Sequence, residues 1–126
     1  MSGRSAARRT ALFLLYQSDV TGQPLASLYE GEIDPFARGL AEAVTERTLE
    51  LDERITAASE GWPADRLGAV ERNVLRIGAY ELEAGSVPAE VAINEAVELA
   101  KRYASEEAAS LVNGILGRIA RERVET

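Results

Sequence analysis

Four clusters of helix-breaking residues divide this 126-residue chain into short segments. Each cluster contains both glycine and proline, and none is long enough for an interdomain linker; they lie at 21–24, 31–35, 61–63 and 85–88. Between them apolar residues recur three or four positions apart, whereas strict polar–apolar alternation is absent over any useful length. The chain is therefore expected to be an all-α single domain over residues 1–126.

The first half predicts two main helices. The first should cover about residues 4–20, with an apolar side that includes Leu12, Leu15, Tyr16 and Val20. Asp34 and Pro35 mark the start of a long helix ending before Gly61, because Asp can cap free N–H groups and proline at the first helical position sacrifices no hydrogen bond. A short helical turn around Asp65 is expected to follow.

The second half predicts a central helix with two more behind it. Residues 70–83 carry apolar side chains on more than one face, the pattern of a helix enclosed by neighbours. Another helix follows Pro88, and Ser105 should cap a last helix whose first turn contains Glu106 and Glu107. Two small helical bundles packed together would bury all these apolar stripes.

The composition excludes most familiar enzymes. The chain has no Cys and no His, so it lacks thiolate nucleophiles, Ser-His-Asp relays and the usual zinc ligands. The remaining catalytic alternative is carboxylate-only chemistry, for which the clusters are Glu30, Glu32 and Asp34, and Glu106 with Glu107; a solvated loop and a helix N-terminus are the ordinary explanations. No apolar run approaches the roughly 20 residues of a membrane span. The protein is expected to be a cytoplasmic non-enzyme.

Positive charge gathers at the N-terminus although the net charge is −7. Arg4, Arg8 and Arg9 precede the first acid, Asp19, and Tyr16 lies two helical turns beyond them. Guanidinium groups can bind phosphates and an aromatic ring can stack on an unpaired base, so this is the most plausible nucleic-acid surface. The alternatives are a solvated face for the arginines and a core position for Tyr16.

The pair Gly114 and Gly117 is similar to a GxxG clamp on RNA, but the two residues between them belong to an apolar helical stripe. Close helix packing is the favoured interpretation of this pair.

Three segments carry a specific resemblance to a known family. They are VERNVLRIGAYEL at 70–82, VAINEAVELAK at 91–101 and VNGIL at 112–116, and the opening Arg8-Arg9 through Leu15-Tyr16 also fits. Together they resemble the NusB family of transcription antitermination factors. The resemblance covers nearly the whole chain, with residues 22–60 supporting it only through their helical pattern.

This resemblance implies about seven helices in two orthogonally packed bundles, and no cofactor. It also implies binding to the boxA element of nascent ribosomal RNA together with the ribosomal small-subunit protein NusE, within an antitermination complex on RNA polymerase. The implied RNA contacts are Arg4, Arg8, Arg9, Tyr16, Glu107 and Leu111. The implied NusE contacts are Asp65, Glu71 and Arg76.

Two other functions compete with this adaptor role. A NusB-like domain also begins some ribosomal RNA methyltransferases, but the chain ends at Thr126 without room for a catalytic domain. The second is a helical protein-interaction or self-associating module with no RNA binding of its own. Relatives include monomers and homodimers, and a homodimer could cover the RNA face.

Overall fold

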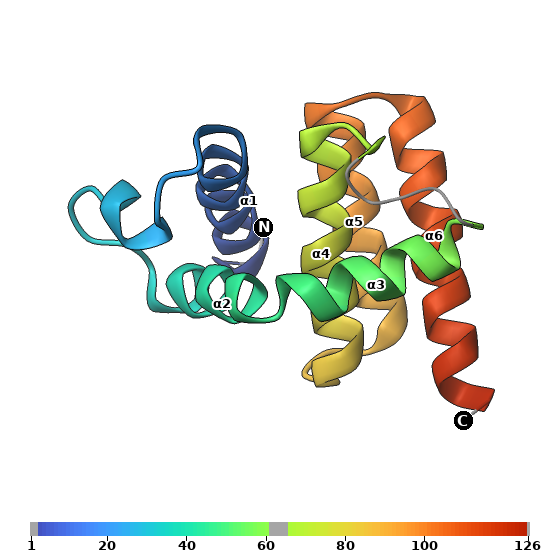
Figure 1. The fold of residues 1–126 in the computed structure, drawn as a ribbon. Coiled ribbons are helices and arrows are strands. Elements are labelled where there is room, and N and C mark those ends of the chain that lie inside the picture. The colour runs from blue at the N-terminus through green and yellow to red at the C-terminus, as the bar shows by residue number, and fades with distance from the viewer. Residues whose placement is uncertain (1–2, 61–65, 126) are drawn as a thin grey trace.

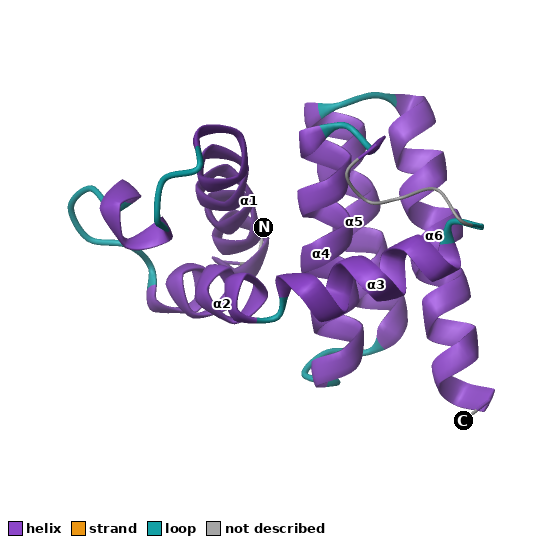
Figure 2. Ribbon diagram, in the orientation of Figure 1, coloured by secondary structure: helices purple, strands orange, loops and turns teal. Residues whose placement is uncertain are grey.

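The structure, a computed structural model, describes residues 3–60 and 66–125, and within this part every regular element is a helix (Figure 2). The expected all-α class is confirmed, and six α-helices with one 3-10 turn approach the expected seven. The elements are α1 (Gly3–Thr21), η1 (Leu25–Leu28), α2 (Pro35–Glu46), α3 (Thr48–Ala58), α4 (Ala69–Ala84), α5 (Ala89–Tyr103) and α6 (Glu106–Glu125).

The helices form two groups, as expected. Helices α1 and α2 and the η1 turn lie on one side, while α4, α5 and α6 lie alongside one another on the other (Figure 1). Helix α3 continues from α2 and crosses α4 toward α6, so it connects the groups. None of the described helices is long and apolar enough to cross a membrane.

Helix α4 is the centre of the fold, which confirms its predicted role. It packs against α1, α2, α3, α5 and α6, and it buries residues on several sides, among them Val74, Leu75, Ile77 and Leu82. Gly78 allows α6 to approach closely, because a Cβ atom placed there would lie 2.5 Å from Cδ1 of Leu116. A missing side chain therefore sets the distance between two core helices.

The prediction of a single long helix after Pro35 is wrong, because the helix is interrupted at Arg47, which separates α2 from α3. The Arg47 N–H donates to the Val44 carbonyl at 3.1 Å, three residues back, and its φ of −112° leaves the helical region. Its side chain donates to Glu83 of α4 at 2.6 Å. The break lets α3 cross α4, and no glycine or proline marks it.

Two predicted caps have different outcomes. Ser105 caps α6 as expected, since the Ala108 N–H donates to its hydroxyl oxygen at 2.9 Å. Asp34 does precede α2, with Pro35 at the first helical position, but its carboxylate makes no capping hydrogen bond. The predicted start of α2 is confirmed, and the predicted capping by the Asp34 side chain is wrong.

Helix α1 buries only part of the apolar side predicted from the sequence. Leu12 and Leu15 are buried, together with Ala7, Ala11 and Leu14. By contrast Tyr16 is 38% exposed and Val20 is 52% exposed, so neither belongs to the core. The expected apolar side is wrong for these two residues, and they remain available at the surface.

Candidate nucleic-acid interface

The three N-terminal arginines point to three different environments. Arg8 is buried in the junction between the two groups of helices. Its Nε and Nη2 atoms donate to the two carboxylate oxygens of Glu81 in α4 at 2.8 and 2.9 Å, and Nη1 donates to Glu95 in α5 at 2.9 Å. This placement corrects the expectation that Arg8 lies on an exposed basic face, because its guanidinium is already occupied by carboxylates.

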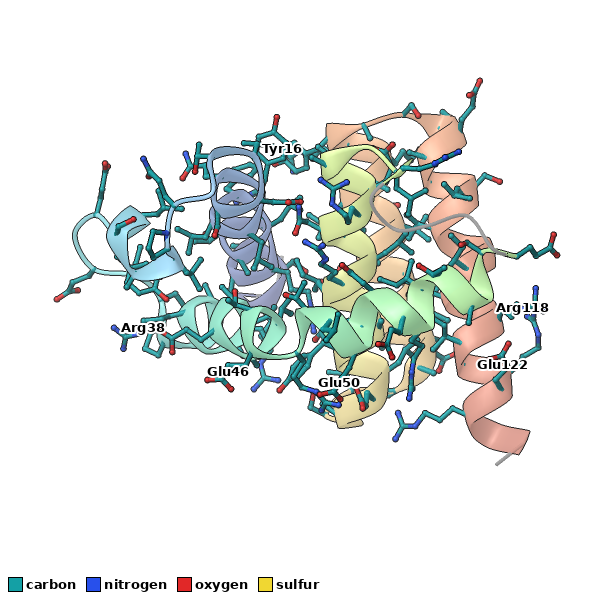
Figure 3. All side chains as sticks on the ribbon, in the orientation of Figure 1. Tyr16, Arg38, Glu46, Glu50, Arg118 and Glu122 are labelled. Carbon is teal, nitrogen blue, oxygen red and sulfur yellow. The ribbon has the colours of Figure 1, made fainter. Side chains whose placement is uncertain are left out.

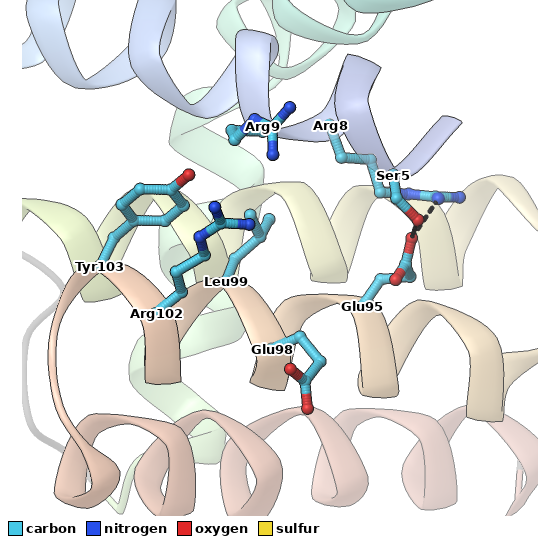
Figure 4. Close-up of a pocket in the computed structure, with 8 residues that line it drawn as sticks. All are labelled: Ser5, Arg8, Arg9, Glu95, Glu98, Leu99, Arg102 and Tyr103. Carbon is cyan, nitrogen blue, oxygen red and sulfur yellow. Dashed lines mark hydrogen bonds and ion pairs between the residues drawn. The ribbon is translucent and has the colours of Figure 1, made fainter. Parts of the chain in front are cut away.

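Arg4 and Arg9 lie nearer the surface, on different sides of α1. The guanidinium carbon of Arg4 lies 4.6 Å from the ring centroid of Phe36 in α2, a cation–π distance. Arg9 instead lines a groove between α1 and α5 (Figure 4). Arg8 also reaches α5, but its guanidinium is bonded to Glu95 there, whereas no ion pair of Arg9 is found among the described residues.

This groove, called here the α1/α5 groove, has a volume of about 270 Å³ and is lined by Ser5, Arg8, Arg9, Glu95, Glu98, Leu99, Arg102 and Tyr103. The guanidinium groups of Arg9 and Arg102 point toward one another across it, with the Tyr103 ring beside them (Figure 4). Sequence reasoning missed Arg102 and Tyr103. Their positions at the end of a predicted helix gave no sign that they would face α1.

Aromatic residues extend this basic groove along α1. Phe13 meets Tyr103 edge-to-face, with ring centroids 5.1 Å apart. Arg9, Phe13, Tyr16 and Val20 follow one another at helical spacing, and Tyr16 projects from α1 at the upper edge of the molecule in Figure 3. Exposed rings beside unpaired guanidinium groups are typical of surfaces that bind single-stranded nucleic acid.

The other predicted RNA residues, Glu107 and Leu111, lie in a second groove. This α3/α6 groove has a volume of about 590 Å³, and its lining includes Ala58, Ser59, Glu60, Glu107, Leu111, Gly114 and Arg118. It begins just beyond the short turn that joins Tyr103 to Glu106, at the end of the molecule where α5 meets α6 (Figure 1). Of the predicted RNA residues, two line the α1/α5 groove, Arg8 and Arg9, and two line the α3/α6 groove, Glu107 and Leu111, whereas Arg4 and Tyr16 line neither.

The glycine pair of α6 does not pack as expected. Among the described residues, a Cβ atom on Gly114 would meet nothing within 4 Å, and one on Gly117 would meet only Arg121. Close helix packing is therefore the wrong explanation for Gly114, which instead lines the α3/α6 groove. The close-packing glycine is Gly78.

The side chain of Arg76, a predicted NusE contact, is bonded to another helix of the same chain. Its Nε and Nη2 atoms donate to the carboxylate of Asp52 in α3, both at 2.7 Å, and its side chain is 11% exposed. Glu71 lies half-buried in the first turn of α4. The third predicted residue, Asp65, lies outside the described residues.

Asp19 joins the end of α1 to α4. Its Oδ2 atom accepts hydrogen bonds from Nε of Arg72 at 2.8 Å and from Nδ2 of Asn73 at 2.9 Å, and Arg76 lies 3.5 Å away. Burial opposes ionisation of Asp19, but the bonds from Arg72 and Asn73 and the charges of Arg72 and Arg76 lower its pKa below the ordinary value. The carboxylate is thus held charged against α4.

Comparisons with known proteins agree with this geometry. The transcription antitermination protein NusB of Rubrobacter xylanophilus is 47% identical over 120 residues, which cover 90% of this chain and 86% of that protein. T. maritima NusB superposes with a TM-score of 0.84 at 33% identity, covering 99% of each chain. A chain from the crystal structure of the antitermination factors NusB and NusE with double-stranded RNA superposes with a TM-score of 0.83 at 31% identity, covering 94% of this chain and 96% of that one.

The family assignment rests on both sequence and fold. The profile described as the NusB family matches residues 5–121, which include every residue that lines the two grooves. Identity of 47% over most of two chains of similar length supports the same assignment. This chain belongs to the NusB family.

Proposed function

We propose that this chain is a non-enzymatic adaptor that binds RNA and protein in bacterial transcription antitermination. The main observation behind this proposal is that the chain belongs to the NusB family, which includes a similar chain crystallised with NusE and double-stranded RNA. The proposed partners are boxA of nascent ribosomal RNA, the ribosomal small-subunit protein NusE and, through them, RNA polymerase. Action on nascent transcripts requires a cytoplasmic location.

The proposed RNA face runs along the exposed side of α1. Arg9 supplies positive charge for the phosphates, and Tyr16 supplies an exposed ring for a base. Arg4 lies over Phe36 and adds charge at the start of the helix. Arg8 acts indirectly in this proposal, since its bonds to Glu81 and Glu95 hold α1 in the orientation that turns Arg9 toward α5.

Glu107 and Leu111 are proposed to continue this face beyond the turn between α5 and α6. Glu107 is exposed and its carboxylate can accept hydrogen bonds from the amino groups of bases. Leu111 is 41% exposed and offers an apolar surface without the stacking ability of an aromatic ring. RNA affinity of the isolated chain should therefore be modest, with NusE supplying further contacts.

The proposed NusE surface surrounds the start of α4. Glu71 can contact the partner directly, and Asp65 is proposed with it because it precedes the same helix in sequence. Arg76 is nearly buried, so it is proposed to support this surface by holding α3 against α4. Arg76 would then affect NusE binding indirectly, by determining where α3 lies.

The test is boxA RNA binding with and without NusE over a salt series, for the wild type, Arg9→Glu and a control variant, Arg38→Glu, on the exposed surface of α2. NusE should tighten wild-type binding, and Arg9→Glu should both weaken binding and flatten its salt dependence. Arg38→Glu should have a much smaller effect. If the wild type binds no RNA with or without NusE, the family fold serves another function here.

A self-associating module is a second candidate, favoured by one observation. Phe13, Tyr16 and Val20 form an exposed apolar stripe on α1, and they are 47%, 38% and 52% exposed. A second copy covering this stripe would also cover the proposed RNA face. Light scattering distinguishes the two functions, since a dimer whose mass is unchanged by boxA RNA would favour self-association alone.

A further inference from the structure

The α1/α5 groove contains two arginines whose guanidinium groups face one another without a carboxylate between them. Within residues 3–60 and 66–125, neither Arg9 nor Arg102 makes an ion pair. The side chain of Arg102 contacts the Tyr103 ring, with 5.5 Å between the guanidinium carbon and the ring centroid. Two like charges that face each other are stabilised when an anion lies between them.

The carboxylates that line the groove do not supply this anion. Glu95 is occupied by Ser5, which donates to it at 2.5 Å, and by Arg8 at 2.9 Å. The Glu98 side chain points away from both guanidinium groups (Figure 4). The groove is thus positively charged where Arg9 and Arg102 line it, although the protein as a whole is negative.

We infer that Arg9 and Arg102 form a clamp for a single phosphodiester group of the bound RNA, contributed jointly by α1 and α5. Each guanidinium presents a planar fork of N–H donors that matches two phosphate oxygens, and two forks from opposite sides fix the phosphate between the helices. Tyr103, positioned by Phe13 and Arg102, then lies where the adjoining base can stack. This inference rests on the proposed function, because it assigns a phosphate contact within the same RNA face.

A single clamped phosphate fits the geometry better than a diffuse basic patch. The two cations come from opposite walls of a groove of about 270 Å³, whereas a patch that follows the RNA backbone would present them along one surface. Lys101, the preceding residue on α5, provides the contrast, since it does not line the groove and its ammonium lies 3.8 Å from the Glu106 carboxylate. A position in the groove, more than positive charge alone, should therefore determine which of these side chains contributes to RNA binding.

The experiment uses the full chain with NusE and boxA RNA over a salt series. Arg102→Gln should weaken binding at least about tenfold and reduce the slope of log Kd against log salt by about 0.7, the value for one phosphate contact on a single strand. Arg102→Lys should keep the slope while losing affinity, because it keeps the charge and loses the fork. Lys101→Gln removes the same charge one position away and should leave both quantities close to the wild type.

The shared phosphate adds a second requirement. Arg9→Gln and Arg102→Gln together should weaken binding by less than the product of their separate effects, because either change already breaks the clamp. A series of boxA RNAs, each with one neutral methylphosphonate linkage, should contain one position at which the modification weakens wild-type binding and barely affects the double variant. Circular dichroism should show unchanged helix content in these surface variants.

Two results would overturn the clamp, and they differ in what they say about the proposed function. If the wild type binds boxA RNA and Arg102→Gln matches Lys101→Gln in affinity and slope, the clamp is wrong while RNA binding stands. If the wild type binds no RNA with or without NusE, the clamp and the proposed function both fall.

Discussion

Arg8 of α1 donates hydrogen bonds from Nε and Nη2 to the two carboxylate oxygens of Glu81 in α4, and both side chains are almost completely buried. The hydrogen bond to Glu81 outweighs burial in raising the pKa of Arg8 above its ordinary value, with Glu95 contributing as well, so the guanidinium stays charged. This ion pair joins the two groups of helices, and Arg9, the next residue, is positioned by it.

Removing one partner of this pair should destabilise the fold strongly. Glu81→Gln is expected to lower the free energy of unfolding by about 3 kcal/mol, because it leaves a buried guanidinium with Glu95 as its remaining carboxylate. Urea unfolding measures this change, with Glu46→Gln on the exposed surface of α2 as the control. The double variant Arg8→Met/Glu81→Met should be more stable than Glu81→Gln; a loss below about 1 kcal/mol for Glu81→Gln would contradict the expectation.

Asp19 should make the free energy of unfolding depend on pH in the acidic range. Its pKa is lowered in the folded chain, so its stabilising contribution is complete above the unfolded value of about 3.9 and is lost as pH falls through the folded value. Asp19→Asn should therefore cost about 2 kcal/mol near pH 7 and progressively less toward pH 3, as followed by urea unfolding at each pH. Asp34→Asn, which removes no side-chain capping bond, is the control. An Asp19→Asn effect of equal size at both ends of the range would show that the charge is unimportant.

Two glycine-to-alanine changes should shift stability in opposite directions. Gly78→Ala should destabilise by about 1–3 kcal/mol, because the added carbon meets Leu116, which is fully buried between α4 and α6. The carbon added by Gly114→Ala meets no described residue within 4 Å, and the change should stabilise by up to about 1 kcal/mol, since alanine is the better helix former. Thermal unfolding of both variants tests the pair, and equal stabilisation by both would mean that α6 moves aside at little cost.

Tyr103 should contribute stacking to RNA binding without contributing charge. Tyr103→Ala is expected to weaken boxA RNA binding by about 1–3 kcal/mol while the salt dependence stays the same. Tyr103→Phe keeps the ring and its edge-to-face contact with Phe13, so it should bind nearly as well as the wild type. Fluorescence anisotropy with labelled RNA and NusE measures both, and equal binding by the alanine variant would remove Tyr103 from the RNA face.

Helix positions were largely predictable because they depend on short-range patterns. The spacing of apolar residues located α4, and the Ser105 cap located the start of α6. The break at Arg47 was not predictable, since neither Arg47 nor its neighbours Glu46 and Thr48 are strong helix breakers. It depends on where α3 must cross α4, and a contact between distant segments leaves no local mark in the sequence.

The all-helical class, the central position of α4 and the family resemblance could all be recognised from the amino-acid sequence, because periodicity and motifs are properties of neighbouring residues. Which arginines are available to a ligand depends instead on how the helices pack. Arg8 and Arg9 are adjacent, yet the 100° turn between successive helical residues sends one into the core beside Glu81 and the other into the groove opposite Arg102. Their different roles arise from packing between helices far apart in the chain. The Arg8 guanidinium is buried against carboxylates of α4 and α5, whereas the Arg9 guanidinium is left for a ligand.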